Sequence, residues 1–195
     1  FLISTVINAL FVIVQIAAAL LANSTSLLAD AVHNLGDVLS LVLAGIANRL
    51  VKKNPTVKTS YGMKKTSILA ALMNGLLLVF SCGVIATEAI YKFFSPSIVH
   101  AFPVIIVAGV GIAVNGGTAA LFLRGREDLN IRAAYLHLLY DAWISVGVVI
   151  SAILLSWTHW WWIDPLVGLL IALMIMKGTW ELFADSFHLI IDAVP

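Results

Sequence analysis

The chain has 195 residues, of which 62% are hydrophobic and only 11% are charged, and its mean hydropathy is +1.05. This composition excludes an ordinary soluble domain and indicates an integral membrane protein. The formal net charge of +1 identifies no partner by itself, because the positions of the charges matter more than their balance, and no nucleic-acid partner is expected.

Six apolar stretches follow one another along the chain, each close to the ~20 residues that a helix needs to cross a bilayer. We expect transmembrane helices near residues 2–22, 26–49, 66–91, 103–123, 132–157 and 164–184. The first connection, ANSTS, contains residues suited to helix capping, and Asp164 with Pro165 is expected to cap the sixth helix. The predicted fold is an all-α membrane protein, a six-transmembrane-helix bundle in which residues 1–195 form a single transmembrane domain.

Basic residues gather in the second and fourth connections, on one side of the predicted bundle. They are Arg49, Lys52, Lys53, Lys58, Lys64, Lys65, Arg124, Arg126 and Arg132. Only Lys92 lies in a connection on the opposite side, where the tryptophans at 157 and 160–162 are typical of an aromatic belt. The positive-inside rule therefore predicts that both termini are cytoplasmic.

Several polar residues in the spans are expected to serve the structure rather than transport. Glu88 and Lys92 are four residues apart and are expected to form an ion pair at the outer end of the third span. Four amides are expected to form hydrogen bonds between helices: Asn8, Gln15, Asn74 and Asn115. Because Cys82 is the only cysteine, any bound metal must be held by nitrogen and oxygen ligands.

Two stretches, HNLGD at 33–37 and HLLYD at 137–141, each place a histidine and an aspartate four residues apart. On a helix, residues at this spacing lie on one face, so each pair is half of a site. At 1.5 Å per residue, Asp37 lies ~16 Å below the outer end of its span and Asp141 ~14 Å above the inner end of its own. Both aspartates are thus expected near the bilayer midplane, where the pairs meet if the two helices pack together.

A carboxylate near the bilayer centre costs at least ~2.5 kcal/mol, and the two pairs place two of them there. No lysine or arginine lies inside the first five spans except at their ends, and Lys177 in the sixth is close enough to the inner surface to snorkel. Protonation or a bound metal ion must then neutralise the carboxylates. Two imidazoles and two carboxylates suit tetrahedral zinc better than calcium or magnesium, which prefer oxygen ligands. The predicted ligands are His33, Asp37, His137 and Asp141.

Three alternatives to a transported metal stay open at this point. Each histidine and aspartate could pair on their own helix or hold two helices together, and the four groups could form a proton relay without metal. An intramembrane metalloenzyme would need three ligands, an open position for water and a general base, and no H-E-x-x-H motif is present. Asp30, one turn before His33, fits a fifth ligand, part of an outward vestibule, or a group outside the ligand set that orients His33; we favour the last.

Four stretches resemble the transmembrane part of the cation diffusion facilitators: SLLADAVHNLGDVLSLV, YGMKKTSILAALMNG, NIRAAYLHLLYDAWISVGVV and WWIDPLVGLLIALMIMKGTWEL. The resemblance covers essentially the whole chain and is strongest to zinc-preferring members. It implies that His33, Asp37, His137 and Asp141 are the metal ligands. It also implies a homodimer in which each subunit carries its own intramembrane site.

The function that the resemblance implies is secondary transport rather than enzymatic catalysis. Divalent metal, most of all zinc, with cadmium and cobalt as further cargo, would leave the cytoplasm in exchange for protons, with no cofactor beyond the transported ion. A midplane site between oppositely directed helices suits alternating access. The expected location is the cell (inner) membrane, and the cytoplasmic C-terminal domain of many relatives is expected to be absent from residues 1–195.

Overall fold

The structure, a computed structural model, describes residues 2–51, 66–121 and 129–190 and consists there of six helices. They are α1 (Leu2–Ala22), α2 (Thr25–Val51), α3 (Thr66–Phe94), α4 (Ala101–Leu121), α5 (Leu129–Thr158) and α6 (Ile163–Ile190). The prediction of an all-α, six-helix bundle is confirmed. Most of the basic residues used to predict the orientation lie outside the described ranges: Lys52, Lys53, Lys58, Lys64, Lys65, Arg124 and Arg126.

The helices begin and end within three residues of the predicted spans, with one exception. Helix α6 continues to Ile190, past the predicted end at 184. The hydropathy pattern ends earlier than the helix because Asp185 and Ser186 are polar, although their backbone remains helical. Over the described residues, five helices are long and apolar enough to cross a membrane, and α1 has a shorter apolar stretch at Val6–Ala22.

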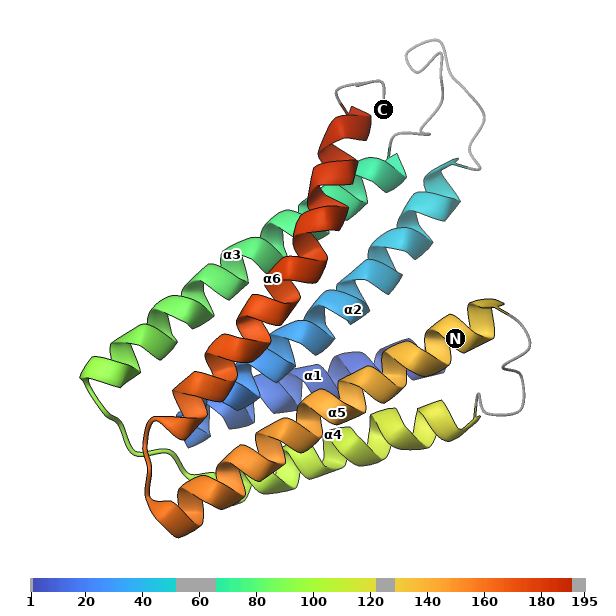
Figure 1. Cartoon of the computed structure of the whole chain (residues 1–195). Helices are drawn as coiled ribbons and strands as arrows, with labels where there is room; N and C mark the ends of the chain where they lie inside the picture. The colour runs from blue at the N-terminus through green and yellow to red at the C-terminus, as the bar shows by residue number, and fades with distance from the viewer. Residues whose placement is uncertain (1, 52–65, 122–128, 191–195) are drawn as a thin grey trace.

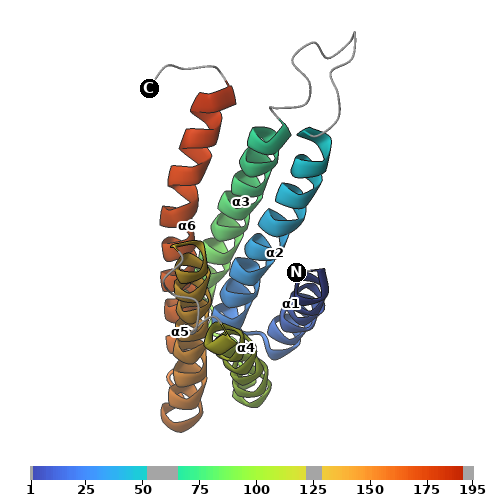
Figure 2. The same cartoon turned by 90° about the vertical axis from the view of Figure 1, so that its right-hand side faces the viewer.

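The six helices form two groups that separate toward one end of the molecule (Figures 1 and 2). Helix α2 lies beside α3 and α6, and α3 packs along α6 over much of its length. Helices α4 and α5 pair with each other, and α1 lies against α2 and α4. The start of α1 and the end of α6 lie on the side where α2, α3 and α6 diverge from α4 and α5. The α1–α2 turn and the α5–α6 connection lie at the opposite end, which we call the closed end.

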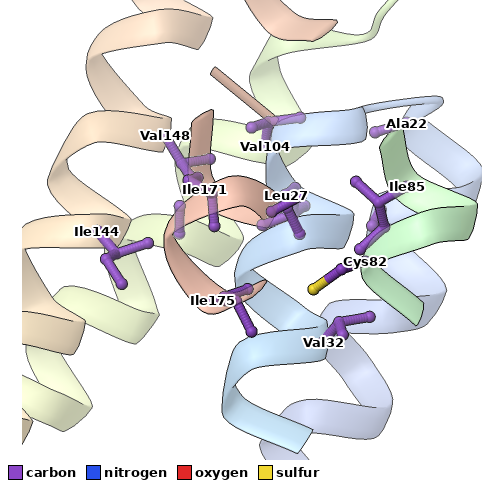
Figure 3. Packing of buried hydrophobic residues seen from close by; sticks show 14 of the residues in the cluster. Ala22, Leu27, Val32, Cys82, Ile85, Val104, Ile144, Val148, Ile171 and Ile175 are labelled. Atoms are coloured by element: carbon purple, nitrogen blue, oxygen red, sulfur yellow. The ribbon is translucent and has the colours of Figure 1, made fainter. Parts of the chain in front are cut away.

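Apolar side chains from all six helices fill the closed half of the bundle (Figure 3). Leu27, Val104 and Val148 have no exposed surface, and Ile85 is 1% exposed. Alanines at contact positions, such as Ala22 and Ala29, let the helix backbones come close together, as is common in membrane bundles. This packing holds the helices together on the side of the bundle away from the termini.

Asp164 ties the start of α6 to the start of α2. Its Oδ1 accepts hydrogen bonds from the Ser24 and Ser26 hydroxyls, both at 2.6 Å, and its Oδ2 accepts one from the Thr25 backbone N–H at 2.6 Å. The prediction that Asp164 caps its own helix is therefore wrong: it satisfies free N–H groups at the N-terminus of α2 instead. Ser24 completes this cap by accepting a 3.2 Å hydrogen bond from the Leu27 N–H, as the ANSTS sequence predicted.

Lys92 forms a second polar link at the closed end. Its Nζ lies 2.8 Å from Glu88 Oε1, which confirms the predicted ion pair, and donates to the Asn23 carbonyl and the Thr25 hydroxyl, both at 2.9 Å. Lys92 is only 6% exposed, so it is a buried cross-helix contact rather than an interfacial side chain. Helix α3 is thereby joined to the α1–α2 turn, where Asn23 adopts the left-handed φ of 54°.

Gly168 allows α6 to contact the backbone of α2, and a methyl group there should destabilise the fold. A Cβ at this position would lie 2.8 Å from the Thr25 carbonyl carbon and 2.9 Å from its oxygen, closer than side chains approach backbone atoms. We expect Gly168→Ala to cost about 1–3 kcal/mol, measured as a lower melting temperature of the detergent-solubilised protein. Gly147→Ala is the matched control, because a Cβ there meets nothing within 4 Å. Equal melting temperatures for the two variants would contradict this packing.

Candidate metal site

Helices α2 and α5 bring the two predicted histidine and aspartate pairs together. His33 Nε2 lies 3.0 Å from Asp141 Oδ1 on the other helix and 3.9 Å from Asp37 Oδ2 on its own. His137 Nε2 lies 3.5 Å from Asp37 Oδ2 and 3.7 Å from Asp141 Oδ2. The shortest contacts thus cross between the helices, so the four residues form one cluster rather than two separate pairs.

Three of the four residues have donor atoms close enough together to hold one metal ion. One ligand atom from each of His33, Asp37 and Asp141 can lie within 4.8 Å of the others, and His137 contacts both carboxylates. Within the described part of the chain, both carboxylates form ion pairs with histidines alone. Asp37 Oδ2 is buried and accepts no hydrogen bond there. A buried carboxylate oxygen without a donor is stabilised by a cation, so the residues fit a metal ion.

A cavity of about 400 Å³ leads to the cluster from one side. Its walls come from the middle parts of α2, α3, α5 and α6 and include Asp37, Asn74, His137 and Thr179. Exposure falls along the cluster, from 50% for the His137 side chain through 32% for Asp37 to 5% for Asp141. The cluster is therefore open toward the end that carries both termini and shut off from the closed end.

Gly36 lets α3 come close to α2 at the cluster. A Cβ on Gly36 would lie 2.7 Å from a methyl carbon of Leu78 on α3, so the missing side chain leaves the room that Leu78 fills. Gly36 and Leu78 both line the cavity. The glycine between His33 and Asp37 thus sets the spacing of α2 and α3 at this depth.

Asp30 lies on the closed side of the cluster and joins three helices. It has no exposed surface and accepts hydrogen bonds from Gln15 Nε2 on α1 at 2.8 Å and Ser145 Oγ on α5 at 2.9 Å. Asn34 Nδ2 donates to the same glutamine at 3.0 Å. Among the described residues, no hydrogen bond joins Asp30 to His33, so any support of the histidine acts through the positions of α2 and α5.

Some members of this network could be predicted from the sequence and others could not. Gln15 and Asn74 form hydrogen bonds between helices as expected, Asn74 through a 2.7 Å bond from its Nδ2 to Ser40 Oγ. Asn115 differs, because its Nδ2 is buried without a partner among the described residues. Ser145 was not predicted to take part, although its position four residues after Asp141 places it on the same helix face.

Comparison with known proteins identifies the family. Residues 1–191 match the sequence profile described as the cation efflux transmembrane domain. The chain belongs to the cation efflux family. The predicted resemblance to the cation diffusion facilitators is thereby confirmed, and the chain is an integral, multi-pass membrane protein.

Several curated relatives are similar over nearly the whole chain. The zinc transporter ZitB of Pectobacterium atrosepticum is 34% identical over 97% of this chain and 60% of its own length. The cadmium, cobalt and zinc/H(+)-K(+) antiporter of Bacillus subtilis is 34% identical over 100% of this chain and 63% of its own length. The metal cation efflux system protein CzcD of Cupriavidus metallidurans is 31% identical over 95% of this chain and 59% of its own length. The chain thus spans about three fifths of the length of these relatives.

Proposed function

We propose that this cation efflux chain carries out proton-coupled export of divalent metal, principally zinc, with cadmium and cobalt as further cargo. His33, Asp37, His137 and Asp141 are the proposed ligands of the transported ion, and Asp30 is proposed to hold α2 and α5 in position from the closed side. The observation that carries the proposal is the convergence of both histidine and aspartate pairs at the inner end of a cavity that opens on one side.

The chemistry of the cluster supports exchange of metal for protons. Histidine binds zinc only when it is neutral and carboxylates bind it only when ionised, so protons and metal compete for the same groups. Rocking of one helix group against the other would expose the cluster to the opposite side, as in alternating access. The names of the relatives agree with this function, since one is a zinc transporter and another an antiporter of cadmium, cobalt and zinc.

The proposal includes an orientation, a membrane and an oligomeric state. The basic connections favour cytoplasmic termini in the cell (inner) membrane. In this orientation the cavity faces the cytoplasm, and the exposed Trp157 and Trp160 lie at the outer boundary. The resemblance implies a homodimer. Accessibility of tags at the two termini tests the orientation, and the mass of the detergent-solubilised protein tests the dimer.

Zinc flux into proteoliposomes with an imposed pH gradient tests the function. We expect zinc and protons to cross the membrane in opposite directions, and the rate of zinc flux to rise with the size of the pH gradient. Because the Bacillus relative is named for potassium as well as protons, the assay is run with and without potassium. Proton movement that does not depend on zinc would indicate a proton relay. Zinc binding without any zinc flux would indicate a metalloenzyme. Either result would reject the proposal.

Replacing His33 by aspartate should change the preferred ion. The change His33→Asp exchanges a borderline nitrogen ligand for a hard oxygen ligand at a position 3.0 Å from Asp141. Oxygen-rich sites favour ions such as manganese, so we expect the rate of manganese flux relative to zinc flux to rise. Competition between the two ions in the proteoliposome assay measures this ratio. An unchanged ratio would place His33 outside the ligand set.

A further inference from the structure

The side chain of Asn74 lies beside the cavity, and its buried oxygen accepts no hydrogen bond from the described residues. Asn74 is 4% exposed and lines the cavity from α3. Its Nδ2 donates to Ser40 Oγ on α2, but its Oδ1 makes no hydrogen bond within the described residues. A buried acceptor left unpaired is costly, and it indicates a ligand or water that occupies the space before it.

A second oxygen beside the cavity, Asp37 Oδ2, lies near the histidine ring nitrogens but at distances longer than a hydrogen bond to His33 and at the upper limit for His137. Asp37 Oδ2 is also buried and accepts no hydrogen bond from the described residues. Ser40 follows Asp37 by three residues, so the two side chains lie on one face of α2, and Ser40 is itself bonded to Asn74. A carboxylate, a hydroxyl and an amide oxygen from two helices therefore line one stretch of the cavity.

We propose that Asn74, Ser40 and Asp37 form an approach subsite, which binds a partly hydrated divalent cation before it reaches the histidines. This inference rests on the proposed transport function and adds a position to it. All three ligands are oxygens, which suit a cation that keeps some of its waters. The cavity of about 400 Å³ has room for these waters, since a water occupies roughly 30 Å³.

The subsite gives the ion a way to lose its water in steps. Asp37 belongs to both positions, because its Oδ2 also lies 3.5 Å from His137 Nε2. The ion can thus exchange Asn74, Ser40 and water for imidazole nitrogens while it remains bound to one carboxylate. Selection for zinc then takes place at the histidines, since oxygen ligands alone distinguish poorly against harder ions.

A purely structural role for Asn74 is the alternative. If Asn74 only held α3 against α2, its hydrogen bond to Ser40 would account for its whole role. Replacing its side-chain amide would then lower the stability of the protein and leave the transport kinetics unchanged. The two roles therefore differ in which measured quantity changes.

The test measures zinc uptake into proteoliposomes as a function of zinc concentration, together with equilibrium zinc binding and melting temperature. For Asn74→Leu we expect KM to rise about fivefold to tenfold, the range of one hydrogen-bond-sized contact, with kcat and equilibrium affinity unchanged. Asn74→Asp keeps a side-chain oxygen at this position, unlike Asn74→Leu, so its KM should equal the wild-type value or fall below it. Ser40→Ala should raise KM less than Asn74→Leu does.

Ser151→Ala is the matched control, because this buried hydroxyl donates to the Val148 carbonyl of its own helix and lies outside the cavity lining. A normal KM for Asn74→Leu, or a raised KM that Asn74→Asp does not restore, would overturn the subsite. If Asn74→Leu does not fold, Asn74→Asp and Ser40→Ala decide by the same KM criteria. A wild-type protein without zinc flux would instead reject the proposed function itself.

Discussion

Replacing Asp141 by asparagine is expected to lower zinc flux by roughly a hundredfold or more, the upper range for changes around metal ligands. Both aspartates lie near both histidines, and Asp141 makes the shortest of these contacts: its Oδ1 lies 3.0 Å from His33 and its Oδ2 lies 3.7 Å from His137. Its side chain is only 5% exposed, so solvent water cannot take the place of the carboxylate beside a bound ion. Asparagine keeps the shape of the side chain but removes the anion that stabilises a bound cation.

Zinc-dependent stabilisation provides a second measurement on the same variant. A ligand at one hundred times its Kd stabilises the folded state by about 2.7 kcal/mol, so zinc should raise the melting temperature of the wild type. We expect Asp141→Asn to lose this rise. The control is Asp185→Asn, the same change at an exposed aspartate on α6, which should keep both flux and stabilisation. Equal flux in Asp141→Asn and the control would count against the proposed ligand set.

Replacing Asp164 by alanine is expected to give the largest loss of stability in the bundle, roughly 3 kcal/mol or more. The carboxylate is 2% exposed and accepts short hydrogen bonds from Ser24, Thr25 and Ser26. Without it, the Thr25 N–H and at least one of the two serine hydroxyls, which lie 3.3 Å apart, remain buried without an acceptor, each at a cost of about 1–3 kcal/mol. The melting temperature of the detergent-solubilised protein should therefore fall well below that of the wild type.

Two further variants test the cause of this loss. Asp164→Asn keeps an acceptor oxygen but not the charge, so its melting temperature should lie between those of Asp164→Ala and the wild type. Asp185→Ala makes the same change at an exposed position of the same helix and should have little effect. If Asp164→Ala melted at the wild-type temperature, the contact between α2 and α6 could not hold the closed end together.

The positions of the helices could be predicted because they depend on local properties of the chain. A bilayer-length apolar run must be helical to satisfy its backbone, and polar connections with capping residues end it. The spacing of His33 with Asp37 and of His137 with Asp141 also follows from helix geometry alone. The helices end within three residues of the predicted spans except at α6, where the helix continues past the polar Asp185 and Ser186 to Ile190.

The contacts that decide function depend on which helices pack together, and no local pattern contains this information. His33 is closer to Asp141, 108 residues away, than to Asp37 on its own helix. Asp164 caps α2 rather than α6, and Asn74 lines a cavity whose walls come from α2, α3, α5 and α6 together. The amino-acid sequence alone determined the six helices and the two half-sites. Only the tertiary structure decided that the half-sites join and from which end they are reached, because both depend on packing between distant segments.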